Sequence, residues 1–158
     1  MRIQICRILT AVCCVMTLTG FAAAQRSRAS VPAAEVNGTF QMKFTGKFRG
    51  SSNEIKILAL GGGRLRVAME LIYPYVVKGE LSANIGELDG EAMIKGDTAI
   101  YASSENGKCT ITIKFVTPGT IKVSQEGADF DCGFGHNVTS DGIYHKVSSA
   151  KPTFESER

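Results

Sequence analysis

The sequence predicts an all-β protein, a small antiparallel up-and-down β-barrel of eight or nine strands, with a β-sandwich as the alternative fold. Apolar and polar residues alternate with period two through most of the chain, and turn-forming residues separate the alternating runs. After residue 24 the sequence shows no helical stripe of three turns. Such alternation, with one face exposed to solvent, is typical of antiparallel sheet. A meander of hairpins removes its exposed edge strands when the sheet closes into a barrel.

Residues 1–24 are interpreted as a secretory signal peptide. Arg2 and Arg7 precede an apolar run, and Ala22-Ala23-Ala24 supplies small residues for cleavage before Gln25. The apolar run is too short to cross a bilayer, which takes about 20 apolar residues. We therefore expect a chain that is exported to the periplasm or secreted.

Cleavage changes both the charge and the cysteine count of the chain. Loss of Arg2 and Arg7 leaves 16 of the 18 basic residues against 15 acidic ones, so the formal net charge falls from +3 to +1. The sequence contains no run of Lys and Arg, so we expect no nucleic acid and no membrane as partner after cleavage. Cys109 and Cys132 are the two cysteines that remain, and in an oxidising compartment they predict one disulfide.

The mature chain has the size of one domain. Residues 25–36 are polar, rich in small residues and without periodicity, which predicts a flexible N-terminal segment. Residues 37–148 form the predicted barrel, and residues 149–158 are predicted to be a disordered tail.

Alternation identifies the residues that face the core. Phe40, Met42 and Phe44 share one face of the first predicted strand, and Pro74 marks a bend or an edge strand because proline cannot donate to a β-ladder. The predicted inward residues of the later strands are Ile55, Ile57, Ala59, Leu65, Val67, Met69, Leu71, Cys109, Ile111, Ile113, Phe115, Ile121 and Val123.

Turn chemistry separates these strands. Gly61-Gly62-Gly63 divides two strands, and Asp89-Gly90 and Gly96-Asp97 are predicted to flank a short one. Asn106-Gly107 predicts a type I′ hairpin, since both residues tolerate positive φ. Thr117-Pro118-Gly119 fits a type II turn, with glycine at the position of positive φ.

The stretch from Asp131 to Tyr144, DCGFGHNVTSDGIY, is interpreted as the seam of the barrel. The strand that begins at Cys109 returns as a hairpin, so Cys132 should lie close to Cys109 and form the disulfide. Residues 143–147 are predicted to pair with the first strand and close the barrel, with Ile143 and Val147 pointing into the core.

A metal or catalytic site in the same stretch is the competing interpretation. Its ligands would be Cys109, Cys132, His136 and either His145 or Asp131, but zinc sites usually show paired spacings that are absent here. No nucleophile elbow or phosphate-binding loop occurs either. We therefore predict a protein that is not an enzyme and has no catalytic, cofactor-binding or metal-binding residues.

Tyr73, Tyr75 and Tyr101 form the possible binding surface. Exposed tyrosines anchor interfaces at low entropic cost. The alternative is that they are partly buried at the rim of the barrel.

The C-terminal pattern resembles that of small exported bacterial β domains, some of which are attached to proteins named as lysozyme inhibitors. The resemblance rests on CTITIKF and IKVSQ, on the Cys-Gly segment after them, and on Asp141-Gly142-Ile143-Tyr144. The stretches GKFRGSSNEIKI and GELDGEAMIKGDTAIY are also similar in style. This resemblance implies a small barrel that inhibits a lysozyme-like cell-wall hydrolase.

We therefore expect an exported, monomeric binding protein without a cofactor, whose partner is an extracytoplasmic protein or a small ligand. Inhibition of a lysozyme-like hydrolase is the first specific form of this function. A calycin-like barrel that holds a small ligand in its lumen is the alternative.

Overall fold

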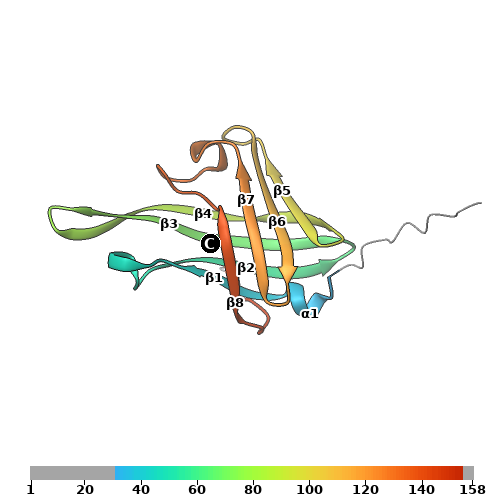
Figure 1. Cartoon of the computed structure of the whole chain (residues 1–158). Helices are drawn as coiled ribbons and strands as arrows, with labels where there is room; N and C mark the ends of the chain where they lie inside the picture. Colours follow the sequence, from blue (N-terminus) through green and yellow to red (C-terminus); the bar gives the residue numbers. More distant parts are fainter. Residues whose placement is uncertain (1–30, 155–158) are drawn as a thin grey trace, which may run out of the picture.

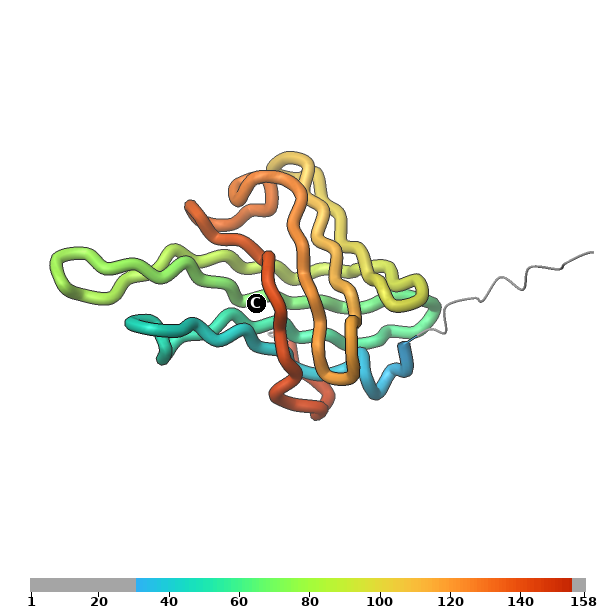
Figure 2. Tube along the Cα trace, viewed as in Figure 1, coloured from blue at the N-terminus to red at the C-terminus, as the bar shows by residue number. Residues whose placement is uncertain are grey.

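The structure is a computed structural model that describes residues 31–154; the predicted signal peptide, residues 25–30 and residues 155–158 lie outside this range. Its strands follow one another as an antiparallel meander, and β1 pairs with β8 to close a barrel (Figures 1 and 2). The predicted barrel is confirmed. The strands are β1 (Gly38–Lys43), β2 (Ser52–Gly61), β3 (Arg64–Val77), β4 (Glu80–Lys95), β5 (Thr98–Ser103), β6 (Cys109–Thr117), β7 (Thr120–Glu126) and β8 (Gly142–Ser148). Short helices are α1 (Ala33–Val36), η1 (Gly46–Phe48) and η2 (Phe130–Cys132).

The two ends of the barrel differ in their connections. Tight turns join β2 to β3, β4 to β5 and β6 to β7 at one end, which also holds α1; we call it the turn end. The longer connections, residues 44–51, 104–108 and 127–141, lie with the β3–β4 hairpin at the other end, the loop end. Gly119 has φ 72°, as the predicted type II turn requires.

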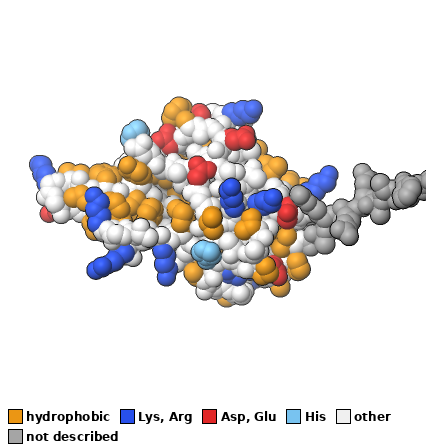
Figure 3. Space-filling model, in the orientation of Figure 1, with side chains coloured by type: hydrophobic (Ala, Val, Ile, Leu, Met, Phe, Trp, Pro, Cys, Tyr) orange, Lys and Arg blue, Asp and Glu red, His pale blue; other side chains and the backbone are white. Residues whose placement is uncertain are grey.

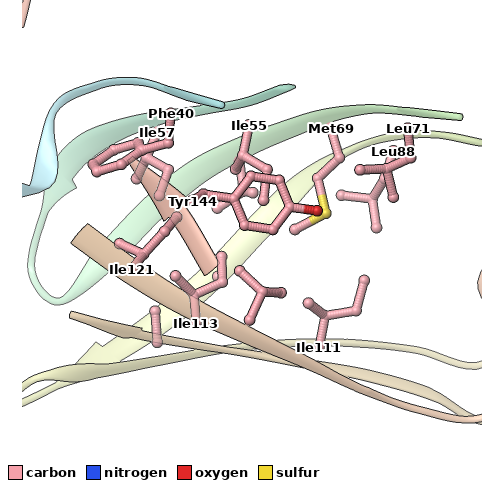
Figure 4. Packing of buried hydrophobic residues seen from close by; sticks show 14 of the residues in the cluster. Phe40, Ile55, Ile57, Met69, Leu71, Leu88, Ile111, Ile113, Ile121 and Tyr144 are labelled. Carbon is pink, nitrogen blue, oxygen red and sulfur yellow. The ribbon is translucent and has the colours of Figure 1, made fainter. Parts of the chain in front are cut away.

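Large apolar side chains fill the barrel lumen, and Figure 4 shows how they meet. Tyr144 lies at the centre of this packing, and its hydroxyl donates a 3.0 Å hydrogen bond to the Ser140 carbonyl. Burial of a side chain of this size contributes about 1.5–3 kcal/mol to folding. The largest fully buried side chains are Tyr144, Phe40, Ile55, Ile57, Leu65, Met69, Leu71, Ile111, Ile113, Ile121, Val67 and Val123.

The orientation predicted for the last strand is wrong. Ile143 and Val147 are 54% and 51% exposed, whereas Tyr144 is fully buried. Lys146 can share the inner side with Tyr144 because it lies near the turn end, where its Nζ donates to the carbonyls of Ala34, Glu35 and Asn37 at 2.7–3.1 Å. The larger aromatic group therefore sets the register, and the lysine amine finds acceptors at the end of α1.

Apolar residues near both ends of the described range contact the barrel. Val36, in the segment predicted to be flexible, is buried in the core. Pro152, in the predicted tail, is also buried, and the Phe154 ring lies 4.4 Å from the Arg66 guanidinium carbon. Burial of these apolar groups accounts for their contacts with the barrel.

Two predicted turns are also wrong. Asp89-Gly90 lies inside β4, because β3 and β4 form a continuous ladder from Arg64–Met93 to Val77–Glu80. Asn106-Gly107 is part of the longer connection 104–108 and not a type I′ turn, since Asn106 is not among the described residues with positive φ. A prediction that treats every Asp-Gly pair as a turn therefore makes strands too short, because a glycine can also lie within a ladder where a side chain would not fit.

Candidate functional site: the projecting β3–β4 arm

Two neighbouring strands run past the rim of the barrel and form a projecting hairpin, drawn in green at the left of Figure 1. Pairing between β2 and β3 ends at Glu54 and Glu70, whereas β3 and β4 remain paired out to Val77 and Glu80. The hairpin therefore has no neighbouring β2 or β5 partner over its outer part. We call residues 72–85 the arm.

A tight turn fixes the register of the arm. Lys78 and Gly79 connect the strands with φ values of 51° and 85°. Two central residues with positive φ are what a type I′ turn requires, and its twist matches that of the flanking strands. The side chains of the arm are therefore sorted onto two defined faces.

The face that continues the barrel lumen carries the tyrosines. Leu71 is fully buried, and Tyr73, Tyr75 and Val77 follow it on the same side because side chains alternate along a strand. Their cross-strand partners are Asn84, Ser82 and Glu80. We call this mixed aromatic and polar surface the tyrosine face.

The opposite face of the arm is entirely apolar. Its three cross-strand pairs are Ile72 with Ile85, Pro74 with Ala83 and Val76 with Leu81. Exposed fractions are 66% for Leu81, 61% for Ile85 and 42% for Val76. We call this surface the apolar face; large apolar side chains gathered on an exposed ribbon usually mark an interaction site.

The outer edge of β3 offers few free donors to a further strand. The Ile72 amide donates a 2.8 Å hydrogen bond to Oδ1 of Asn53, which is itself buried. Because amides of alternate residues point to the same edge, Pro74 and Val76 are the next positions on it, and proline has no N–H. The prediction that Pro74 marks an edge is therefore confirmed, and the apolar face is more accessible to a partner than this edge.

The connection between β7 and β8, residues 127–141, covers part of the β4 edge; we call it the seam loop. The Gly135 amide donates to the Ile85 carbonyl at 2.9 Å, and Asn84 Nδ2 donates to the His136 carbonyl at 2.6 Å. Phe134 and Val138 are buried against Gly86, where an added Cβ would lie 2.8 Å from either side chain. The seam loop thus anchors the base of the arm.

The seam loop is held in turn by the predicted disulfide and by a carboxylate. Cys109 and Cys132 are bonded with an S–S distance of 2.04 Å, which confirms the prediction. The Asp129 carboxylate accepts hydrogen bonds from the amides of Asn137 (2.6 Å) and Phe130 (2.8 Å). These backbone donors lower the pKa of Asp129, with a smaller contribution from His136.

The cysteines and histidines of the competing metal interpretation do not form one cluster. Both cysteines are in the disulfide, and among residues 31–154 no three His, Cys, Asp or Glu side chains are grouped to hold a metal. His136 is exposed with its Nδ1 3.6 Å from Asp129, and His145 lies 3.4 Å from the Thr120 hydroxyl on the barrel wall. The two histidines are therefore separate surface groups.

Two of the three predicted tyrosines come together in the arm. Tyr73 is 43% exposed and Tyr75 is half-buried on the tyrosine face. Tyr101 lies on β5 instead, where its ring packs against Gly90 of β4. The predicted surface is therefore split, and Tyr101 belongs to the barrel wall.

The β1–β2 connection beside the arm is basic, whereas the seam loop at the same end of the barrel carries Asp129, Asp131 and Asp141. Residues 43–51 and 72–85 contain Lys43, Lys47, Arg49 and Lys78 but a single acidic residue, Glu80, a net charge of +4 − 1 = +3. The space-filling view shows blue side chains at the left end beside a row of hydrophobic ones (Figure 3). Basic side chains therefore lie beside apolar ones at the arm and the β1–β2 connection, whereas the seam loop is acidic.

An open groove of about 380 Å³ hollows the outer wall at the base of the arm. It lies on the same side of the sheet as the apolar face, and carboxylates dominate its polar groups. It is lined by Lys56, Ala68, Met69, Glu70, Glu87, Leu88, Asp89 and Phe154.

No family model, curated protein or solved structure matches the chain. Within residues 31–154, no helix is long and apolar enough to cross a membrane. The disulfide is consistent with an oxidising, extracytoplasmic compartment.

The sequence contained a signal for the arm that alternation alone did not reveal. Residues 72–77 are apolar or aromatic on both alternating registers of β3, and Lys78-Gly79 separates them from a run in β4 that could pair without a gap. A strand buried on both faces and a strand exposed beyond the barrel show the same pattern, because periodicity does not report the neighbouring strands.

Proposed function

We propose that the protein is an exported, non-enzymatic binding protein that engages an extracytoplasmic macromolecule through the tyrosine face of the arm. The observation that carries this proposal is that Tyr73 and Tyr75 lie beyond the barrel rim on a hairpin with a continuous ladder and a tight turn. Tyrosine offers a large amphipathic contact area with few rotatable bonds, so it loses little entropy on binding.

The basic side chains beside the arm support a partner with an acidic surface. Lys43, Lys47 and Arg49 lie at the end of β1 and in the β1–β2 connection, Lys78 lies at the apex of the arm, and complementary charge speeds association and aligns the partners. Glycoside hydrolases that cleave cell walls carry paired carboxylates in their clefts. Inhibition of a lysozyme-like hydrolase is therefore the specific form of the function that we propose.

The packed lumen weighs against the calycin-like alternative. Tyr144, Phe40 and Met69 are among the fully buried side chains that occupy the volume a small ligand would need. A ligand would have to displace well-packed apolar groups, and removing a large core side chain typically costs about 2–5 kcal/mol.

The experiment is a titration of the mature protein against purified lysozyme-type hydrolases, with lysis of a cell-wall suspension as the readout. We expect inhibition by the wild type and at least a tenfold weaker inhibition constant for Tyr73→Ser/Tyr75→Ser, about 1.4 kcal/mol. Val116→Ser is the matched control, since Val116 is 44% exposed on β6 and outside the arm.

Wild-type protein that inhibits none of these hydrolases would reject the inhibitor form of the proposal. Capture from an extracytoplasmic extract then tests the broader form. A partner retained by the wild type and by Val116→Ser but lost by the tyrosine variant would support it. Equal retention by all three proteins would reject the tyrosine face as the binding surface.

A further inference from the structure

The apolar face is not used by the proposed function, because it lies on the side of the arm opposite the tyrosines. Its six residues form three cross-strand pairs with no covering element among the described residues. The Ile72 amide donates to Asn53 and the Ile85 carbonyl accepts from Gly135, so both residues direct their hydrogen-bonding groups away from the β3–β4 ladder. This pair and the alternate pairs beyond it are therefore non-hydrogen-bonded. Side chains approach most closely in such pairs, so the face is a continuous apolar strip.

Opposite charges lie at the two ends of this strip. Glu70 and Glu87 are paired across the strands at its base, and like charges placed directly opposite destabilise a ladder. Lys56 Nζ is 2.9 Å from Glu70, but within residues 31–154 no ion-pair partner faces Glu87. At the apex Lys78 is likewise exposed and, in the described part of the chain, without a carboxylate partner.

The spacing of these charges is symmetric about the middle of the strip. Glu70 lies four residues before Pro74 and Lys78 four residues after it, about 14 Å in each direction at 3.4 Å per residue. If two strips pack face to face and antiparallel about the Pro74–Ala83 pair, each apolar pair meets an apolar pair. The Lys78 apex of each copy then reaches the Glu70–Glu87 base of the other, where the open groove lies.

We propose that the partner of the apolar face is a second copy of this chain, in a two-fold symmetric dimer built by antiparallel packing of the two arms. A two-fold interface uses the same surface twice, and this strip is self-complementary in both apolarity and charge. This proposed dimer differs from the monomer that the sequence predicts. It leaves the tyrosine face of each arm open and does not depend on the proposed function.

Both edges of the arm are partly blocked, which favours face-to-face packing over edge-to-edge pairing. On β3, Asn53 occupies the Ile72 amide and Pro74 has no N–H; on β4, the Gly135 amide occupies the Ile85 carbonyl. The contact is small, since a two-stranded ribbon about 27 Å long and about 10 Å wide gives an interface at the low end of the specific range. We therefore expect a micromolar dissociation constant, with monomer in dilute solution.

Sedimentation equilibrium of the mature chain at low salt, from about 1 to about 500 µM, tests the proposal. We expect a reversible monomer–dimer equilibrium that Leu81→Lys weakens at least tenfold. Ile143→Lys is the matched control, since Ile143 is 54% exposed on β8 and should leave the equilibrium unchanged. A wild type that stays monomeric throughout, or a Leu81→Lys variant that dimerises as well as the wild type, overturns the proposal.

Charge reversal tests the antiparallel arrangement directly. Lys78→Glu and Glu87→Lys should each weaken self-association roughly fivefold or more at low salt, since each variant brings like charges together twice. An equimolar mixture of the two variants should regain the wild-type affinity, because both contacts of the mixed dimer join opposite charges. A mixture that associates no more tightly than either variant alone overturns the arrangement. Circular dichroism establishes that each variant retains the β signal of the barrel.

Discussion

The ring of Tyr101 occupies the space that a side chain at Gly90 would need: a Cβ at Gly90 would lie 2.6 Å from Tyr101 Cε2. The contact falls where β4 and β5 diverge, since their ladder extends no further than Met93–Ile100. Glycine is therefore required at position 90 for packing and not for a turn. It lets an aromatic ring fill the gap between two strands that no longer pair.

We expect Gly90→Ala to destabilise the protein by about 1–3 kcal/mol, because the added methyl must displace the Tyr101 ring or move the strand. Urea unfolding followed by circular dichroism measures the change. Gly50→Ala is the matched control, since no atom lies within 4 Å of a Cβ at Gly50 and its φ is not positive. Equal stabilities for the two variants would show that the ring moves away at no cost.

Removal of the disulfide should cost about 3 kcal/mol, because Cys109–Cys132 closes a loop with a sequence separation of 23. Cys109→Ser/Cys132→Ser should unfold at lower urea concentration, with a similar folded-state β signal. Thiol titration of the unreduced mature protein should detect no free thiol. Two reactive thiols in the folded wild type would contradict the bond.

The seam loop should respond to acid through Asp129. The amides of Asn137 and Phe130 lower the pKa of its carboxyl from the ordinary value of 3.8, so the ionised form is favoured in the folded state. Its stabilising effect is then complete above pH 3.8 and is lost as the pH falls through the lower folded-state pKa.

We expect the Asn137 and Phe130 amide resonances of the wild type to shift in this acid range, and Asp129→Asn to abolish the shift. Glu105→Gln, a change at an exposed carboxyl on the β5–β6 connection, is the control and should leave the titration unchanged. If the pH-dependent shift of these resonances persists in Asp129→Asn, the titrating group is not Asp129.

The C-terminal segment should contribute modestly to stability. Deletion after Ser148 removes buried Pro152 and the cation–π contact between Phe154 and Arg66, and we expect a loss of about 0.5–2 kcal/mol. Deletion from Gly142 onward removes β8 and leaves β1 and β7 unpaired, so that chain should aggregate or fail to fold.

Phe154→Ala in the full mature chain is the matched variant for the shorter deletion; it removes only the ring contact with Arg66 and should cost less stability than the deletion. Urea unfolding and solubility separate the outcomes. A soluble β-rich protein after deletion from Gly142 would contradict closure of the barrel by β8.

Period-two alternation predicted the barrel and most of its core, because one wet face forces apolar residues to every second position in β2, β3, β6 and β7. The same rule failed in β8, where Ile143 and Tyr144 are both apolar and the choice of face depends on lumen volume and on an acceptor for the tyrosine hydroxyl. The alternation of residues along the strand reports neither the lumen volume nor the position of that acceptor.

The sequence predicts Tyr73, Tyr75 and Tyr101 as one possible binding surface, and the structure places Tyr73 and Tyr75 on the arm. The projection of the arm could not be predicted, since it depends on where β2 and β5 stop pairing with their neighbours. Tyr101 shows the same limit, because its packing partner at Gly90 is brought close by the fold.

The Asn53–Ile72 hydrogen bond also has a consequence for the behaviour of the protein in bulk. An exposed hairpin rich in Ile, Val and Leu is the kind of segment that adds copies strand by strand into fibrils. Such growth needs two receptive edges on every copy, and on the β3 side Asn53 and Pro74 withhold the donors that a new strand would use. Addition on the β4 side could then occur once without propagating. Concentrated solutions should therefore remain free of amyloid despite the sequence of the hairpin.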